Sequence, residues 1–178
     1  MRTLLLDSVD STNSYLKRTC QNKTEPYLFI RAIEQFAGRG RLNRQWIAEK
    51  NKALFLSVLL PDVDKSYQLG LVAAYSALTM IQNQFNLQCS LKWPNDLYWQ
   101  NKKLGGVLSE KHGQHIILGI GINLNQAGFE DEWGENAVSL AMATGNTIDI
   151  PKFSASLQNQ LMLDFSSWQN DPDAFLQT

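Results

Sequence analysis

One eight-residue run constrains the fold of this chain more than any other segment. Residues 53–60 read Ala-Leu-Phe-Leu-Ser-Val-Leu-Leu, so apolar side chains are nearly continuous, and Pro61 follows directly. Strands that are buried on both faces carry such runs, and proline cannot continue the ladder of a central strand. The run therefore predicts a central strand that stops at Pro61.

Six other segments have strand character. They are residues 3–6, 27–33, 89–93, 96–99, 103–110 and 115–123. The last three are separated only by short turns, and connections of this length join antiparallel partners. We therefore predict three adjacent antiparallel strands in the second half of the chain.

Three segments have helical signals. Apolar residues recur at nearly helical spacing from 66 to 85, which predicts a long helix packed on the sheet. Residues 10–13 offer N-caps for a short helix, and Pro151 opens a final amphipathic helix that reaches Trp168. The stretch 126–136 is polar and irregular. These elements predict one α+β domain over residues 1–178, with a mixed, largely antiparallel sheet covered by helices.

Composition excludes several classes of protein. The 178 residues are 44% hydrophobic and carry a net charge of -1, so the whole chain has no general attraction to nucleic acid or anionic membranes. Cys20 and Cys89 are far apart, which argues against a disulfide framework or a zinc site. His112 and His115 are predicted to be surface residues without a metal role. The first apolar run, residues 4–6, is too short for a signal peptide, and we predict a cytoplasmic protein.

The segment Gly38-Arg39-Gly40-Arg41-Leu42-Asn43-Arg44-Gln45-Trp46, called the Gly/Arg loop below, carries the clearest chemical signal. Glycines let backbone N–H groups approach a ligand, and arginine forks match the geometry of carboxylates and phosphates. The loop therefore predicts a site for an anionic ligand.

Further clusters accompany the loop in a specific order. They are Ser11-Thr12-Asn13, Gln35 to Ala37, Lys92-Trp93-Pro94-Asn95-Asp96-Leu97, Lys103-Leu104-Gly105-Gly106-Val107-Leu108, and Gly119-Ile120-Gly121-Ile122-Asn123. In this order, residues 8–125 closely resemble the catalytic domain of biotin protein ligases, whose fold is of the class II synthetase-like biotin/lipoate ligase type. The combination of the Lys-Trp-Pro-Asn-Asp-Leu and Gly-Ile-Gly-Ile-Asn motifs is the most specific part of the resemblance.

The resemblance implies an ATP-dependent biotin–[biotin carboxyl-carrier protein] ligase. Such an enzyme forms biotinoyl-5'-AMP from biotin and MgATP, and then acylates a lysine of the carrier domain of a biotin-dependent carboxylase. Cations that hold the two anions together lower the barrier of the first step. By similarity, Lys92, Arg41 and Arg39 are the catalytic candidates. The Mg²⁺ ligands cannot be chosen from the sequence.

The resemblance also implies two sets of binding residues. Arg44, Trp46 and Asn123 correspond to the ATP or adenylate side. Hydroxyl and amide side chains suit the ureido ring of biotin, because an unpaired buried polar atom is costly. The biotin-binding candidates are Ser11, Thr12, Asn13, Gln35, Gly38, Arg39, Gly40, Arg41, Lys92, Gly105 and Gly106.

The chain departs from the family pattern in three places. Leu42 and Asn43 stand where the family commonly has Arg and Gly, which removes one charge and one flexible joint from the loop. Because only ten residues stand before Ser11, we expect no N-terminal winged helix-turn-helix and the monofunctional type without DNA binding. We also expect no C-terminal SH3-like domain after the last helix, which would bear on catalytic efficiency. A weak homodimer through an exposed strand edge is compatible with the sequence, and no membrane contact is expected.

Other interpretations remain open. A lipoate or octanoate ligase or transferase would use the same kind of domain. A nucleic-acid-binding module would contact phosphates and bases through Arg39, Arg41, Arg44 and Trp46. Individual residues also have structural explanations. Ser11, Thr12 and Asn13 suit helix caps, Trp46 and Trp93 suit a core, Lys92 suits a solvated surface, and Gly105-Gly106 suits a packing gap.

Overall fold

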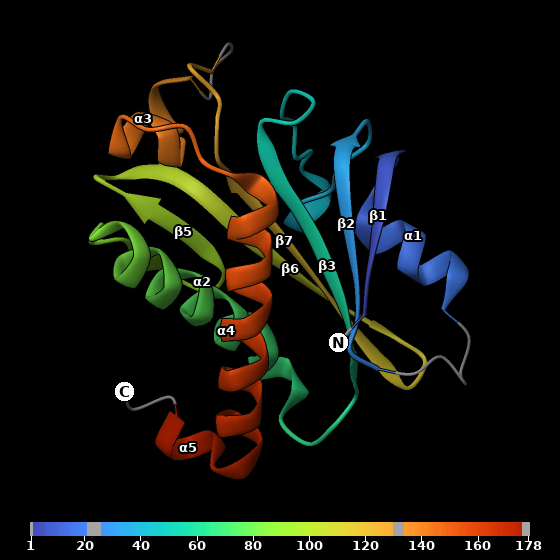
Figure 1. Ribbon diagram of the computed structural model, residues 1–178. Helices are drawn as coiled ribbons and strands as arrows, with labels where there is room; N and C mark the ends of the chain where they lie inside the picture. The colour runs from blue at the N-terminus through green and yellow to red at the C-terminus, as the bar shows by residue number, and fades with distance from the viewer. Residues whose placement is uncertain (1, 21–25, 130–133, 176–178) are drawn as a thin grey trace.

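The computed structural model describes residues 2–20, 26–129 and 134–175 (Figure 1). Its centre is one sheet of seven strands in the order β1-β2-β3-β7-β6-β5-β4. Only β1 and β2 pair in parallel, and all other neighbours are antiparallel. The strands are β1 (Arg2–Val9), β2 (Leu28–Gln35), β3 (Ala53–Pro61), β4 (Ser90–Lys92), β5 (Asp96–Trp99), β6 (Lys102–His112) and β7 (His115–Asn123). The predicted α+β class and the predicted run of three antiparallel strands, β5 to β7, are confirmed.

In the described residues, five α-helices surround the sheet. They are α1 (Thr12–Thr19), α2 (Leu69–Phe85), α3 (Leu140–Thr144), α4 (Ile150–Asn170) and α5 (Pro172–Phe175). Ser11 caps α1 by accepting from Ser14 N, and Asp149 caps α4, where proline occupies the first turn. The two predicted long helices, α2 and α4, are confirmed. Sequence reasoning missed α3 and α5 because helices of five and four residues are too short to show a period.

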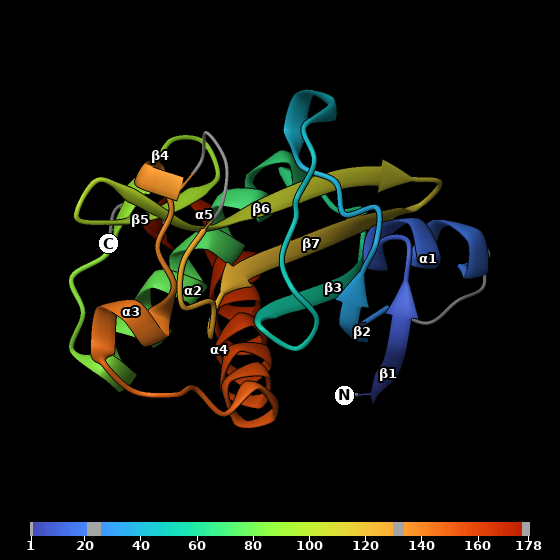
Figure 2. The same ribbon diagram turned by 90° about the horizontal axis from the view of Figure 1, so that it is seen from above.

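The two faces of β3 explain its nearly continuous apolar sequence. Leu54, Leu56, Val58 and Leu60 point to the face that α2 and α4 cover, where they join the main core. Leu59 points to the opposite face and packs against Leu16 of α1. Figure 2 shows α2 and α4 on one side of β6 and β7, and the segment between β2 and β3 on the other. We call the second side the α1 face of the sheet.

Two aromatic residues differ from the sequence-based expectation. His115 was predicted to lie at the surface, but it is buried with 6% of its surface exposed, and its Nδ1 lies 3.8 Å from the sulfur of Cys20. That prediction was wrong because the end of α1 covers the start of β7. Trp93 is 81% exposed, so it is no core aromatic.

None of the helices in the described part of the chain combines the length and the apolarity that a bilayer span requires.

Candidate active site

The parallel pairing of β1 and β2 brings the first two sequence clusters together. Val9 and Gln35 are partners at the ends of these strands, and the chain leaving β2 continues the pairing, since Phe36 N donates to Val9 O at 3.1 Å. The first residues of α1 therefore lie beside Gln35. Thr12 N donates to Gln35 Oε1 at 2.7 Å, and the Thr12 hydroxyl lies 3.0 Å from the same oxygen.

A buried polar network extends from this point across β3. Ser57 Oγ lies 2.7 Å from Thr12 Oγ1 and 2.6 Å from Asn13 Oδ1. The Asn13 amide nitrogen donates to the Glu110 carboxylate at 2.9 Å, which fixes the orientation of the amide and turns its oxygen toward Ser57. Because Asn13 Oδ1 can only accept and a hydroxyl has one proton, Ser57 donates to Asn13 and accepts from Thr12.

The glycines of β7 make room for two side chains on the α1 face. A Cβ atom at Gly119 would lie 2.4 Å from Asn13 Oδ1, and one at Gly121 would lie 2.7 Å from Trp46 Cε2. These two positions hold Asn13 and Trp46 against the sheet. Both side chains come from outside the sheet, so β7 is the floor on which the clusters meet.

The predicted pair Gly105-Gly106 divides between the two faces. A Cβ atom at Gly105 would lie 2.6 Å from Gly121 O and 3.2 Å from a side-chain carbon of Leu97, on the core side. Gly106 pairs with Gly121, and its added Cβ would meet Asp96 Oδ1 at 2.9 Å on the α1 face. Close packing of strands therefore explains Gly105. A ligand contact for either glycine stays a prediction.

The Gly/Arg loop closes on itself and crosses over β7 and β6 (Figure 2). Trp46 N donates to Gly38 O at 2.9 Å, and Gly40 N donates to Arg44 O at 2.7 Å. Gly38 is buried, and a Cβ there would lie 2.3 Å from Trp46 O, so only glycine fits. At the tip, Leu42 adopts φ 55° with 84% of its surface exposed. A left-handed conformation is uncommon for a residue other than glycine, asparagine or aspartate. Leu42 is also one of the two loop positions, with Asn43, at which the sequence departs from the family pattern.

The loop arginines reach two different parts of the sheet. Arg41 Nη1 donates to Asn95 Oδ1 at 2.9 Å. Arg39 donates from both terminal nitrogens to Glu110, at 3.2 and 2.8 Å. Arg44 is exposed. The structure therefore brings Arg41 to the turn after β4 and Arg39 to the last part of β6.

Lys92 is the last residue of β4 and lies directly opposite Asp96 in the pairing of β4 with β5. Its side chain is exposed, and its ammonium nitrogen lies 5.2 Å from the centre of the Tyr98 ring. Residues 93–95 form the turn between the two strands, so the Asn95 that binds Arg41 belongs to the turn that Lys92 begins. Of the three predicted catalytic cations, Arg41 is thus bound to the turn that begins at another, Lys92.

Trp46 and Asn123 lie on neighbouring parts of the α1 face. The Trp46 ring lies over Gly121, and Lys103 Nζ is 5.8 Å from its centre and 2.8 Å from Asp96 Oδ2. Asn123 donates to Val138 O at 3.2 Å and accepts from Gln126 Nε2 at 3.2 Å. Within the described residues, Trp46 Nε1 and Gln126 Oε1 are buried without hydrogen-bond partners. A donor and an acceptor therefore remain available on this side of the site.

Sequence reasoning missed several polar residues of this region. Ser57, Glu110 and Gln126 were not named as site residues, and Asp96 and Lys103 were quoted within the motifs but given no role. A serine inside the apolar run of β3 was a usable signal, since a buried hydroxyl needs a partner. Gln126 belongs to the stretch that was predicted to be polar and irregular, yet only 3% of it is exposed. Residues 130–133 of that stretch lie outside the described residues.

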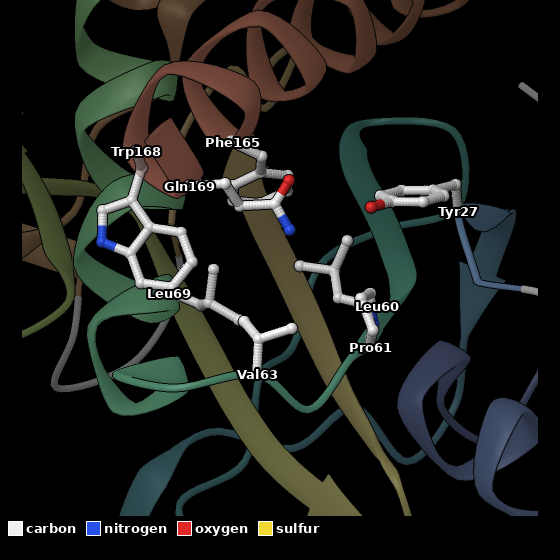
Figure 3. Close-up of a pocket in the computed structure, with 8 residues that line it drawn as sticks. All are labelled: Tyr27, Leu60, Pro61, Val63, Leu69, Phe165, Trp168 and Gln169. Carbon is white, nitrogen blue, oxygen red and sulfur yellow. The ribbon is translucent and has the colours of Figure 1, made fainter. Parts of the chain in front are cut away.

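A separate hollow lies on the opposite face of the sheet (Figure 3). Leu60 and Pro61 at the end of β3, Leu69 of α2 and three residues of α4 surround about 10 Å³ of free space. This volume is at the limit for one water molecule, so the hollow cannot hold a vitamin or a nucleotide.

Comparison with known proteins identifies the family. Residues 5–125 match the Biotin/lipoate A/B protein ligase family. The chain belongs to this family. It is 35% identical over 153 residues to the bifunctional ligase/repressor BirA of Bacillus subtilis, a match that covers 80% of this chain and 47% of that protein. It is 29% identical over 187 residues to the biotin--[acetyl-CoA-carboxylase] ligase of Paracoccus denitrificans, covering 96% of this chain and 74% of that protein.

The fold of this ligase-family chain also matches solved structures. The biotin protein ligase of Aquifex aeolicus in complex with biotin and ATP superposes with a TM-score of 0.88 at 31% identity, covering 96% of this chain and 72% of that chain. The chain spans about half the length of the BirA proteins that it matches. The match to the family model, residues 5–125, starts within β1 and ends just after β7, so it includes α1 and the Gly/Arg loop.

Proposed function

We propose that this chain activates biotin with ATP and transfers it to a lysine of a biotin carboxyl carrier protein. One observation supports the proposal most strongly: the loop arginine Arg41 meets the turn that Lys92 begins, through its hydrogen bond to Asn95. A guanidinium and an ammonium at one turn suit a reaction that joins two anions.

In the first step, a carboxylate oxygen of biotin attacks the α-phosphorus of ATP. The bond between the α-phosphorus and the bridging oxygen breaks, and pyrophosphate leaves with Mg²⁺. Lys92 and Arg41 reduce the repulsion between the carboxylate and the phosphate and keep them in line. In the second step, a carrier lysine amine attacks the acyl carbon, and AMP leaves.

The remaining candidates form two groups around these cations. Thr12 and Gln35 belong to a buried hydroxyl and amide network of the kind that suits the ureido ring, and Gly38 and Gly40 give the loop its close turns. Trp46, with a buried indole N–H free of partners in the described residues, suits the adenine side. Arg44 and Asn123 complete the proposed adenylate side.

The protein residues do not define a resident metal site. In the ranges that the structure describes, no three His, Cys, Asp or Glu side chains gather in a metal-binding group. Asp96 and Glu110, which lie on the α1 face, are each paired with a lysine. We therefore assign Mg²⁺ to the ATP substrate, as the charge partner of the leaving pyrophosphate.

The decisive experiment combines the chain with biotin, MgATP and a carrier domain, and measures the intact mass of the carrier. We expect the addition of one biotinoyl group. A Lys92→Ala variant should lower the rate of pyrophosphate release by about 100-fold or more, as removal of one transition-state donor does. Lys102→Ala is the matched control, because Lys102 is also an exposed strand lysine. Transfer of lipoate or octanoate instead of biotin would refute the biotin assignment.

A further inference from the structure

Glu110 joins three segments that are far apart in the sequence. It lies in β6 opposite Ile117, which packs against α1. Its carboxylate accepts from Lys17 Nζ at 2.6 Å and from Asn13 Nδ2 at 2.9 Å, both on α1. It also accepts both terminal nitrogens of Arg39 from the Gly/Arg loop. One side chain therefore connects β6, α1 and the loop.

Arg39 and Arg41 attach the loop to the sheet at two separate places. Arg41 is bound at Asn95, which precedes Asp96, the partner of Gly106 in β6. Glu110 is four residues farther along β6, roughly 13 Å away at the rise of a strand. Arg39 thus binds β6 itself, whereas Arg41 binds the turn between β4 and β5, and Leu42 at the tip of the loop is exposed.

The charges around Glu110 favour a stable ion pair with Arg39. Burial raises the pKa of the Glu110 carboxyl, but hydrogen bonds from Lys17, Asn13 and Arg39 outweigh burial and hold the pKa below its ordinary value. The group is therefore ionised at neutral pH. One carboxylate between two cations leaves one net positive charge, so Glu110 holds Arg39 without making this part of the α1 face unfavourable for an anion.

We propose that Glu110 is a positioning residue that fixes the base of the Gly/Arg loop through Arg39. Through Asn13, the same carboxylate is joined to the buried network of Ser57 and Thr12. An arrangement of this kind couples the order of the loop to the order of the proposed ureido pocket. The contact between Glu110 and the loop does not depend on the proposed function. Only the ligand that the loop encloses rests on it.

The contact can be tested without any ligand. Chymotrypsin cleaves after exposed leucines, and Leu42 is such a residue in the loop. We expect Glu110→Gln, which keeps the side-chain shape, to speed cleavage after Leu42 about fivefold, the factor expected for one partly exposed two-pronged ion pair. Arg39→Gln should have the same effect, and the double variant should be no faster than either single variant.

Lys17→Met is the matched control, because Lys17 binds the same carboxylate but belongs to α1. Its cleavage rate should stay within about twofold of the parent rate, as for an ion pair that does not hold the loop. Additive effects of Glu110→Gln and Arg39→Gln would overturn the proposal. So would an unchanged rate in Glu110→Gln, or equal acceleration in Lys17→Met, which would assign the effect to α1.

A second measurement connects the contact to catalysis. The adenylate should dissociate about fivefold faster from Glu110→Gln than from the parent, by the same ion-pair factor, while Lys17→Met retains it. Unchanged retention in Glu110→Gln would remove the positioning role in catalysis. A parent chain that forms no adenylate would refute the proposed function instead, and the cleavage rates would still decide whether Glu110 fixes the loop.

Discussion

Ser57→Ala offers a quantitative test of the buried polar network. Ser57 is fully buried, and Asn13, which accepts its proton at 2.6 Å, is 3% exposed. The substitution leaves Asn13 Oδ1 without a donor, and an unsatisfied buried acceptor costs about 1–3 kcal/mol. Thr12 keeps Gln35 Oε1 at 3.0 Å as an alternative acceptor, so only one group is orphaned. We therefore expect a loss of about 2 kcal/mol, or roughly 4–8 °C in the unfolding midpoint of a domain of this size.

Ser76→Ala is the matched control for this prediction. Ser76 is equally buried, but its hydroxyl donates to Val72 O of its own helix, and that carbonyl keeps the helical N–H as a partner. Its loss should be below about 1 kcal/mol, reduced further by the better helix propensity of alanine. Urea unfolding of the three proteins, followed by tryptophan fluorescence, gives the two differences. Equal losses for the two variants, or no loss for Ser57→Ala, would refute the argument from the unsatisfied acceptor.

Three further predictions follow from single contacts. Gly121→Ala should lower the free energy of unfolding by about 1–3 kcal/mol, because its Cβ would strike the Trp46 ring, whereas Gly128→Ala, with nothing within 4 Å, should be nearly neutral in the same urea titration. Burial raises the pKa of the Cys89 thiol to about 11, so iodoacetamide at pH 8 should alkylate Cys89 roughly 100-fold more slowly in the folded than in the urea-unfolded chain, as peptide masses will show. The pKa of Glu110 is lower in the folded chain than in the unfolded chain, where it is about 4.3. This difference adds folding stability that is complete above the unfolded pKa and is lost as pH falls through the folded pKa. Glu110→Gln should lack this part of the dependence of unfolding free energy on pH.

The sequence predicted the sheet well where its signals are local. The apolar run of β3 and the short turns between β5, β6 and β7 depend on neighbours in the chain, and the structure confirms both. The parallel pairing of β1 with β2 has no such signal, because a crossover through α1 separates the strands. This pairing is what brings Thr12 to Gln35.

The predicted site residues were assigned by resemblance, and their contacts could not be predicted. Arg39 and Arg41 were expected to act together, but Arg39 is bound by Glu110 and Arg41 by Asn95. The reason is geometric: Glu110 lies in β6 and Asn95 in the turn between β4 and β5, so the two arginines have partners on different segments. Only the position of β6 in the folded chain shows that the Glu110 carboxylate lies beside Arg39.

The same limit explains the error at His115. A histidine next to a glycine turn is expected in solvent, and the turn was predicted correctly, with Gly113 at φ 59°. Cys20 at the end of α1 nevertheless covers the ring, 95 residues away in the sequence. Burial at the end of a strand depends on which helix lies over it. The residues around His115 in the sequence do not indicate which helix that is.

In the motif Gly-Ile-Gly-Ile-Asn of β7, side chains alternate between the two faces of the sheet, and one face serves the fold while the other serves the site. Ile120 and Ile122 point into the main core, where α2 and α4 cover them. Gly119 and Gly121 point to the α1 face, where a Cβ atom at either position would collide with Asn13 or Trp46. Since alternate residues face opposite sides, a one-residue shift in register would place glycines in the core and isoleucines beneath both side chains. The apolar face therefore fixes the register, and the register in turn decides where α1 and the Gly/Arg loop can rest on the sheet.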